Sequence, residues 1–141
     1  MYSWSAFFIL GVLAGTTAFI IDAMEHDLVF YKWQITETVF EKSFALGWLT
    51  FVIFGLFFGG IAAIMTVFGA PDAAGGGTPE LMGYFNGVNY PSFFGLHTLF
   101  VKVFGLGLAT SSGLCIGKEG PLAHIGAILG HLVVYLPIPF F

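Results

Sequence analysis

Glu119 is the residue of this chain that is best placed to do chemistry. Its carboxylate lies in the stretch Ser111–Gly130, among glycines, a proline and apolar side chains. Placing a charged side chain in the core of a membrane costs at least a few kcal/mol, so such an acid predicts a functional site. A carboxylate tethered beside an anion site can occupy that site when ionised and leave it when protonated. Glu119 is therefore predicted to be a gating or proton-accepting glutamate.

The residues around Glu119 predict that it stands at the start of a helix. Gly117 and Gly120 allow the backbone to approach a ligand closely. Pro121 suits the first turn of a helix, where its missing N–H is not needed, and the apolar run Leu122–Val134 can continue that helix. The free N–H groups and the positive dipole end of a helix N-terminus attract anions.

A structural role for Glu119 is the alternative. Its chain neighbour Lys118 could neutralise it in an ion pair. However, adjacent side chains at a helix start point in different directions, and such a pair would leave the surrounding glycines unexplained.

A second helix start is predicted within the stretch Ala73–Glu80. Three glycines precede Thr78, which is expected to be the N-cap, Pro79 at the first helical position, and Glu80 in the first turn. A glycine-rich entry to a helix N-terminus is also an anion-binding arrangement. Because no Gly-Lys-Ser/Thr ending follows, a nucleotide phosphate loop is not predicted.

The composition indicates an integral membrane protein. Of the 141 residues 57% are hydrophobic and only 9% are charged, with a mean hydropathy of +0.93, whereas soluble domains average about 25% charged residues. The net charge of −4 includes no basic patch that would suggest nucleic acid. One cysteine rules out an intrachain disulfide framework. No paired carboxylates, histidine cluster or activated nucleophile predicts an enzyme, and no cofactor is expected.

Two membrane spans and a polar connection are predicted in the first half. Trp4–Ile21 and Phe44–Phe68 are uncharged and long enough to cross a bilayer. Asp22–Lys42 holds most of the charge and is expected to be a polar connection between the two spans, in part helical. A metal site at Glu25-His26-Asp27 is the less favoured alternative, because adjacent helical side chains do not converge.

The second half is predicted to contain shorter, interrupted helices. Leu81–Gly87 should form a short or broken helix that ends in a turn at Asn86-Gly87, a pattern typical of transport sites. Lys102 is expected to be structural, snorkelling or paired near an interface. The final helix, Leu122–Tyr135, is expected to end before Pro137 and Pro139. Its His124 and His131 share a face, where interior polar contacts are favoured over a proton relay.

Both glycine-rich stretches resemble motifs of one family. Gly117–Pro121 resembles the GKEGP signature of the CLC family of chloride channels and chloride/proton exchangers, in its eukaryotic style. Gly75–Pro79 is similar to the family's GSGIP motif, and Glu80 follows as expected. Gly76 stands where the family has serine, and Thr78 where it has isoleucine. The resemblance implies that the serine hydroxyl binds the anion, for which Gly76 offers only a backbone N–H.

The resemblance implies a fold and a function. The fold is an all-α, multi-pass membrane helical bundle with broken or re-entrant helices, a partial CLC fold over residues 1–141 with no soluble domain. The implied function is chloride transport as part of a voltage-gated channel or a chloride/proton antiporter, with Glu119 as the gating glutamate. The residues implied to bind the anion are Gly75, Gly76, Gly77, Thr78, Pro79, Gly117, Lys118, Gly120 and Pro121.

The resemblance also implies partners. These are chloride or another small anion, protons, membrane lipid and, for a full-length protein, a second copy in a homodimer. The family's G-x-F-x-P motif is absent from Met1–Phe141, so a C-terminal half or a partner chain is expected to complete the pathway, unless the chain is a degenerate fragment. A non-transporting structural subunit of a membrane assembly is the alternative function.

Overall fold

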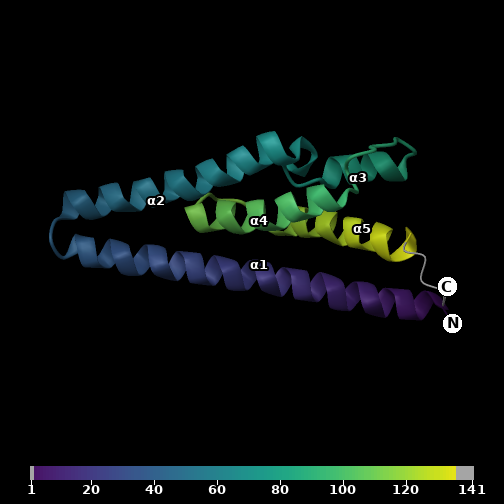
Figure 1. Ribbon diagram of the computed structural model, residues 1–141, viewed down its shortest axis with the longest axis horizontal. Helices are drawn as coiled ribbons and strands as arrows, with labels where there is room; N and C mark the ends of the chain where they lie inside the picture. The colour runs from purple at the N-terminus through teal and green to yellow at the C-terminus, as the bar shows by residue number, and fades with distance from the viewer. Residues whose placement is uncertain (1, 136–141) are drawn as a thin grey trace.

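The computed structural model describes residues 2–135, which form helices joined by short loops (Figure 1). Their order is α1 (Tyr2–Phe40), α2 (Phe44–Ile64), a π-helical turn (Met65–Gly69), a 3-10 turn (Pro71–Ala73), α3 (Thr78–Phe85), α4 (Leu96–Ser112) and α5 (Glu119–Tyr135). No strand occurs within this range, which confirms the all-α class. Pro137 and Pro139, predicted to end the last helix, lie outside the described residues.

Helix α1 corrects one expectation. It is a single helix of 39 residues, so the stretch Asp22–Lys42, expected to be a polar connection that is helical only in part, is helical as far as Phe40. The physical reason is that Asp22–Phe40 contains neither glycine nor proline, and charged residues do not themselves end a helix. The chain turns only at residues 41–43, where Ser43 adopts an extended backbone before α2 begins.

The two predicted membrane spans are confirmed as helices. Two helical runs, Trp4–Phe40 and Phe44–Gly69, are long and apolar enough to cross a membrane. Only 6% and 11% of their most apolar windows are buried, so neither is the packed core helix of a soluble domain. Their exposed side chains include large apolar ones such as Phe8, Phe57 and Phe68, which favours contact with lipid or other protein.

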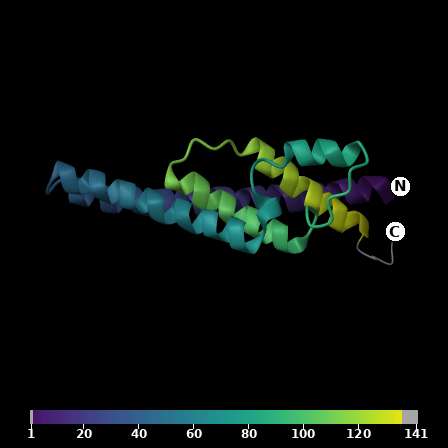
Figure 2. The same ribbon diagram turned by 90° about the horizontal axis from the view of Figure 1, so that it is seen from above.

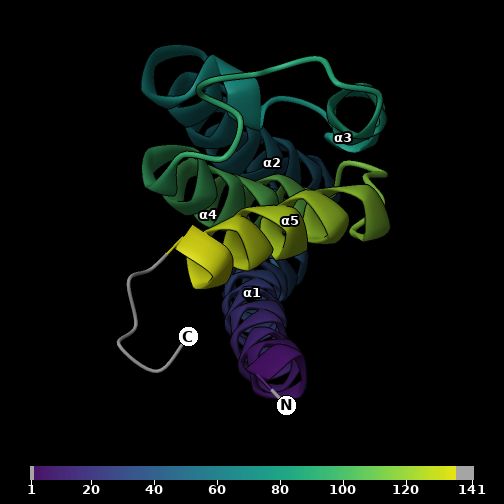
Figure 3. The ribbon, with the colours of Figure 1, turned by 90° about the vertical axis from the view of Figure 1, so that its right-hand side faces the viewer.

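The helices pack as a splayed hairpin with two helices inside it. α1 and α2 are connected at one end and diverge toward the other, and α4 and α5 lie between them (Figures 1 and 3). The buried core joins three helices through Ile21 of α1, Val103 and Leu106 of α4, and Ile125 and Leu129 of α5. Helix α3 lies to one side and contacts α5, as the view from above also shows (Figure 2).

Helix α3 begins one residue earlier than predicted. Gly77 is the N-cap and has φ 76°, so Thr78 is the first helical residue rather than the cap. The reason is the left-handed backbone at Gly77, which glycine adopts without the steric cost that a Cβ brings. Pro79 and Glu80 lie in the first turn as expected. The helix ends at Phe85, and Gly87 with φ 91° forms the predicted turn.

Candidate functional site

The two glycine-rich stretches meet at the starts of α3 and α5. A Cβ atom at Gly120 would lie only 3.3 Å from the Cα of Gly76, and one at Gly76 would lie 3.7 Å from the Cα of Gly120. Thr78 completes this contact, because its Oγ1 would lie 3.5 Å from the same Cβ at Gly120. The backbones of two stretches more than 40 residues apart in the sequence therefore touch where two helices begin.

A cavity of about 530 Å³ opens beside this contact. Gly75 and Gly76 line it from the loop before α3, and Gly117 and Pro121 line it from the start of α5. Small and apolar residues of α2 and α4 form the rest of its wall, among them Gly59, Ala62, Gly105 and Ala109. Because glycine has no side chain, Gly75, Gly76 and Gly117 line the cavity with their backbone.

Lys102 holds the first glycine stretch in place. Its side chain is buried, and its ammonium donates hydrogen bonds to the carbonyl oxygens of Ala73 (2.9 Å) and Gly75 (2.7 Å). The structural role predicted for Lys102 agrees with these bonds. Snorkelling does not, because the ammonium points into the protein and lines the cavity. Sequence patterns could not identify this contact, since its partners are backbone carbonyls of a distant loop.

We expect Lys102→Met to loosen the loop that Lys102 holds. Methionine keeps much of the side-chain length but removes the donor, which leaves two carbonyls unpaired at a cost of about 1–3 kcal/mol. The measurement is hydrogen exchange of the amides of residues 74–78 in detergent, where exchange should become faster. The control is Lys42→Met, because Lys42 is exposed. Equal exchange in the two variants would contradict the anchoring role.

His124 packs against the left-handed glycine of the first stretch. The imidazole is fully buried, is stacked on Phe93 with ring centroids 3.7 Å apart, and has Nε2 3.0 Å from the carbonyl oxygen of Phe93. Because a carbonyl only accepts, Nε2 carries the proton. A Cβ at Gly77 would lie 2.6 Å from Nδ1 of His124. The absence of a side chain at Gly77 thus lets α3 begin directly against α5.

His131, which is seven residues after His124 in α5, makes a similar contact. Its ring is stacked on Phe94 with centroids 5.1 Å apart. The two histidines of α5 therefore do share a face, and both pack on the phenylalanine pair before α4. These interior contacts match the interpretation favoured over a proton relay.

Glu119 begins α5, as predicted, and its side chain is exposed. Gly117 and Pro121, two residues before and after it, both line the cavity. The ion pairs of Lys118 within residues 2–135 go to Asp22 and Glu25 of α1. The alternative in which Lys118 neutralises Glu119 is therefore not formed.

The other predicted anion-binding residues divide into four groups by their position. Gly75, Gly76, Gly117 and Pro121 line the cavity, while Gly77, Thr78 and Gly120 form the contact between the helix starts. Pro79 is exposed in the first turn of α3. Lys118 is turned toward α1 and does not line the cavity. No three His, Cys, Asp or Glu side chains within residues 2–135 are arranged to hold a metal ion.

Comparison with known proteins gives the family of the chain. The family model for the voltage gated chloride channel matches residues 58–138, more than half of the chain and all of both glycine stretches. The chain belongs to the CLC family of voltage gated chloride channels. Its family and its two apolar helices together make it a membrane protein.

Relatives in the CLC family are named as channels and as exchangers. The chain is 35% identical over 128 residues to "Chloride channel protein D" of Dictyostelium discoideum, covering 91% of this chain and 13% of the relative. It is 32% identical to "Chloride channel protein CLC-d" of Arabidopsis thaliana over 92% of this chain and 16% of the relative. It is 31% identical to "H(+)/Cl(-) exchange transporter 7" of Mus musculus over 89% of this chain and 16% of the relative. The chain thus spans only a small part of the length of these CLC proteins.

Proposed function

We propose that this chain supplies part of the anion pathway of a CLC-type chloride channel or chloride/proton exchanger. The observation that carries the proposal is the contact of Gly76 with Gly120 at the starts of α3 and α5, beside the cavity. Two helix N-termini and their free N–H groups then face one region. Each N-terminus carries a partial positive charge of about half an elementary charge, which can replace part of the water around an anion.

The residues of this site have separate roles in the proposal. Backbone groups of Gly75, Gly76 and Gly117 contact the anion, and Pro121 and Lys102 keep the two backbones in place. Lys118 is not included as a direct ligand, because its side chain is engaged with α1. Glu119 enters the anion position when ionised and leaves it when protonated. In an exchanger the same step would carry the proton.

The arrangement in the membrane is part of the proposal. α1 and the run from Phe44 to Gly69 would cross the bilayer, and the shorter helices α3, α4 and α5 would lie inside the protein at membrane depth. Interrupted helices at that depth are tolerated where protein or a water-filled cavity surrounds them. A partner chain or further sequence would complete the pathway, and a second copy would form the homodimer.

Anion flux tests this proposal directly. The native membrane protein that contains this chain would be reconstituted in liposomes loaded with chloride, and efflux would be measured with and without Glu119→Gln. Efflux whose pH dependence requires Glu119 supports the proposal. Absence of flux, with Glu119→Gln changing neither stability nor assembly, would favour the non-transporting structural subunit.

Gly76→Ser is expected to raise the preference for chloride over nitrate. Serine fits at this position, because a Cβ would meet only ordinary contacts at 3.7 Å from Gly120 and 3.9 Å from Thr78. Its hydroxyl would add a hydrogen-bond donor to the site. The strength and direction of that hydrogen bond favour chloride, the small spherical anion, over nitrate. The measurement is the ratio of chloride to nitrate flux. Gly60→Ser is the control, since a Cβ at Gly60 meets nothing within 4 Å and Gly60 does not line the cavity; an equal ratio in both variants would contradict the assignment of Gly76.

A further inference from the structure

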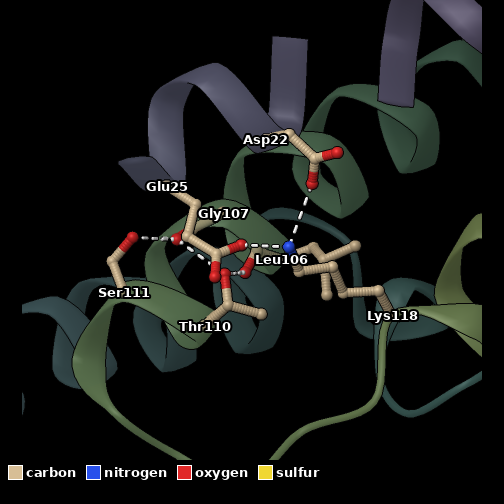
Figure 4. Close-up of polar contacts among 7 residues, drawn as sticks. All are labelled: Asp22, Glu25, Leu106, Gly107, Thr110, Ser111 and Lys118. Carbon is tan, nitrogen blue, oxygen red and sulfur yellow. Dashed lines mark hydrogen bonds and ion pairs between the residues drawn. The ribbon is translucent and has the colours of Figure 1, made fainter. Parts of the chain in front are cut away.

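Lys118 connects the start of α5 to α1 through a group of three charged side chains (Figure 4). Its ammonium lies 2.9 Å from Oδ1 of Asp22 and 2.5 Å from Oε2 of Glu25. Asp22 and Glu25 are three residues apart in α1 and so project from the same face of the helix. Only because α1 continues as a helix beyond Ile21 do both acids reach the residue next to Glu119.

Glu25 is the more enclosed of the two acids. The exposed fraction of its side chain is 25%, against 65% for Asp22. The hydroxyls drawn in Figure 4, those of Thr110 and Ser111, donate to backbone carbonyls of α4 itself. The charge of Glu25 is therefore balanced by Lys118 and not by these hydroxyls.

The group fixes the protonation of Lys118. The hydrogen bond to Glu25, and then that to Asp22, raise the pKa of the Lys118 ammonium above its ordinary value. A raised pKa means that the favourable pairing is fully present below the ordinary lysine pKa and is lost only as the pH rises through the folded-state value. Lys118 therefore stays charged throughout the pH range in which a carboxyl titrates.

The balance of charge next to Glu119 depends on this group. One ammonium and two carboxylates carry a net charge of −1, so the group as a whole does not present a positive charge to the neighbouring Glu119. Without the two acids, Lys118 would be an unpaired cation on the residue next to Glu119 and would favour its ionised form. His26, which lines the same surface hollow as Asp22 and Glu25, is turned to Asp27 at 3.5 Å.

We propose that Asp22 and Glu25 are positioning residues that hold Lys118 away from Glu119 and so set the pH at which Glu119 opens the anion path. This inference rests on the proposed gating role of Glu119. It assigns to the polar part of α1 a role in transport, although neither acid lies in the two glycine stretches and neither lines the cavity between them.

The test is the pH dependence of chloride efflux from liposomes that contain the native membrane protein. We expect Asp22→Asn with Glu25→Gln to shift the midpoint to lower pH by about one unit, since a nearby cation favours an ionised carboxylate by about that much or more. The single variant Asp22→Asn, at the more exposed acid, should shift the midpoint less and in the same direction. If the double variant does not fold, the shift of the midpoint is measured with this single variant instead.

A matched control removes the same charge at the far end of α1 and just after it. Glu37→Gln with Glu41→Gln neutralises two exposed acids near the far end of the helix and should leave the midpoint unchanged. Adding Lys118→Met to the double variant should abolish the shift, which a merely structural effect of Asp22 and Glu25 would not do. An equal shift in the control, or a shift that persists without Lys118, overturns the inference.

The outcomes also separate this inference from the proposed function. If Glu119→Gln leaves the pH profile unchanged, Glu119 is not the gate and both ideas fail. If the profile requires Glu119 but does not move in the Asp22 and Glu25 variants, only the positioning role fails.

Discussion

Transport by the protein with Glu119→Gln is expected to lose most of its pH dependence. Glutamine has nearly the same shape as glutamic acid but cannot ionise, so it resembles the protonated, open form at every pH. A single titrating carboxyl changes its ratio of ionised to neutral form tenfold per pH unit, equivalent to about 1.4 kcal/mol. Removing that titration should flatten the profile by a comparable factor per unit. The measurement is chloride efflux from liposomes at several pH values.

The control for this prediction is another single acid on the same chain. Glu41→Gln removes an exposed carboxylate just after the end of α1, and Glu41 does not line the cavity. It should leave the profile as in the parent protein. If Glu119→Gln and Glu41→Gln give the same pH and voltage dependence, the gate is not Glu119.

The helix starts could be predicted from sequence because their determinants are local. A proline in the first turn and glycines before it define where α3 and α5 begin. α3 begins within one residue of the prediction. α5 begins at Glu119, the residue expected at a helix N-terminus, although this is three residues before the predicted helical run Leu122–Tyr135. The one-residue error at Thr78 also has a local cause. The side-chain pattern does not reveal that Gly77 has a left-handed backbone or that it packs against His124, which is distant in the sequence.

The partners of the charged residues could not be predicted in the same way. The charge density of Asp22–Lys42 predicts a polar connection between two spans, but charged residues do not end a helix, and the stretch Asp22–Phe40 contains neither glycine nor proline. Once α1 is continuous, Lys118 finds its partners 96 residues away at Asp22. Lys102 likewise pairs with carbonyls that no side-chain pattern marks. Such contacts depend on tertiary packing and not on spacing along the chain.

Gly77→Ala is expected to destabilise the protein more than any other single methyl addition in the glycine stretches. Alanine at φ 76° costs about 1–2 kcal/mol. Its Cβ would also lie 2.6 Å from Nδ1 and 2.8 Å from Cβ and Cγ of His124. Because His124 is held by the stack on Phe93 and the bond to its carbonyl, it cannot move aside, and overpacking of this kind adds about 1–3 kcal/mol. The measurement is denaturant unfolding in detergent.

Gly75→Ala separates the two contributions to that loss. Gly75 also has a positive φ of 65°, but a Cβ there would meet nothing within 4 Å, so only the backbone cost applies. The difference between the two alanine variants then measures the clash with His124. Combining Gly77→Ala with His124→Ala should recover much of that difference, because the smaller side chain removes the obstacle while the backbone strain remains. If the two changes are simply additive, the contact between Gly77 and His124 does not hold the start of α3 against α5, and the close approach of the two helix N-termini must have another cause.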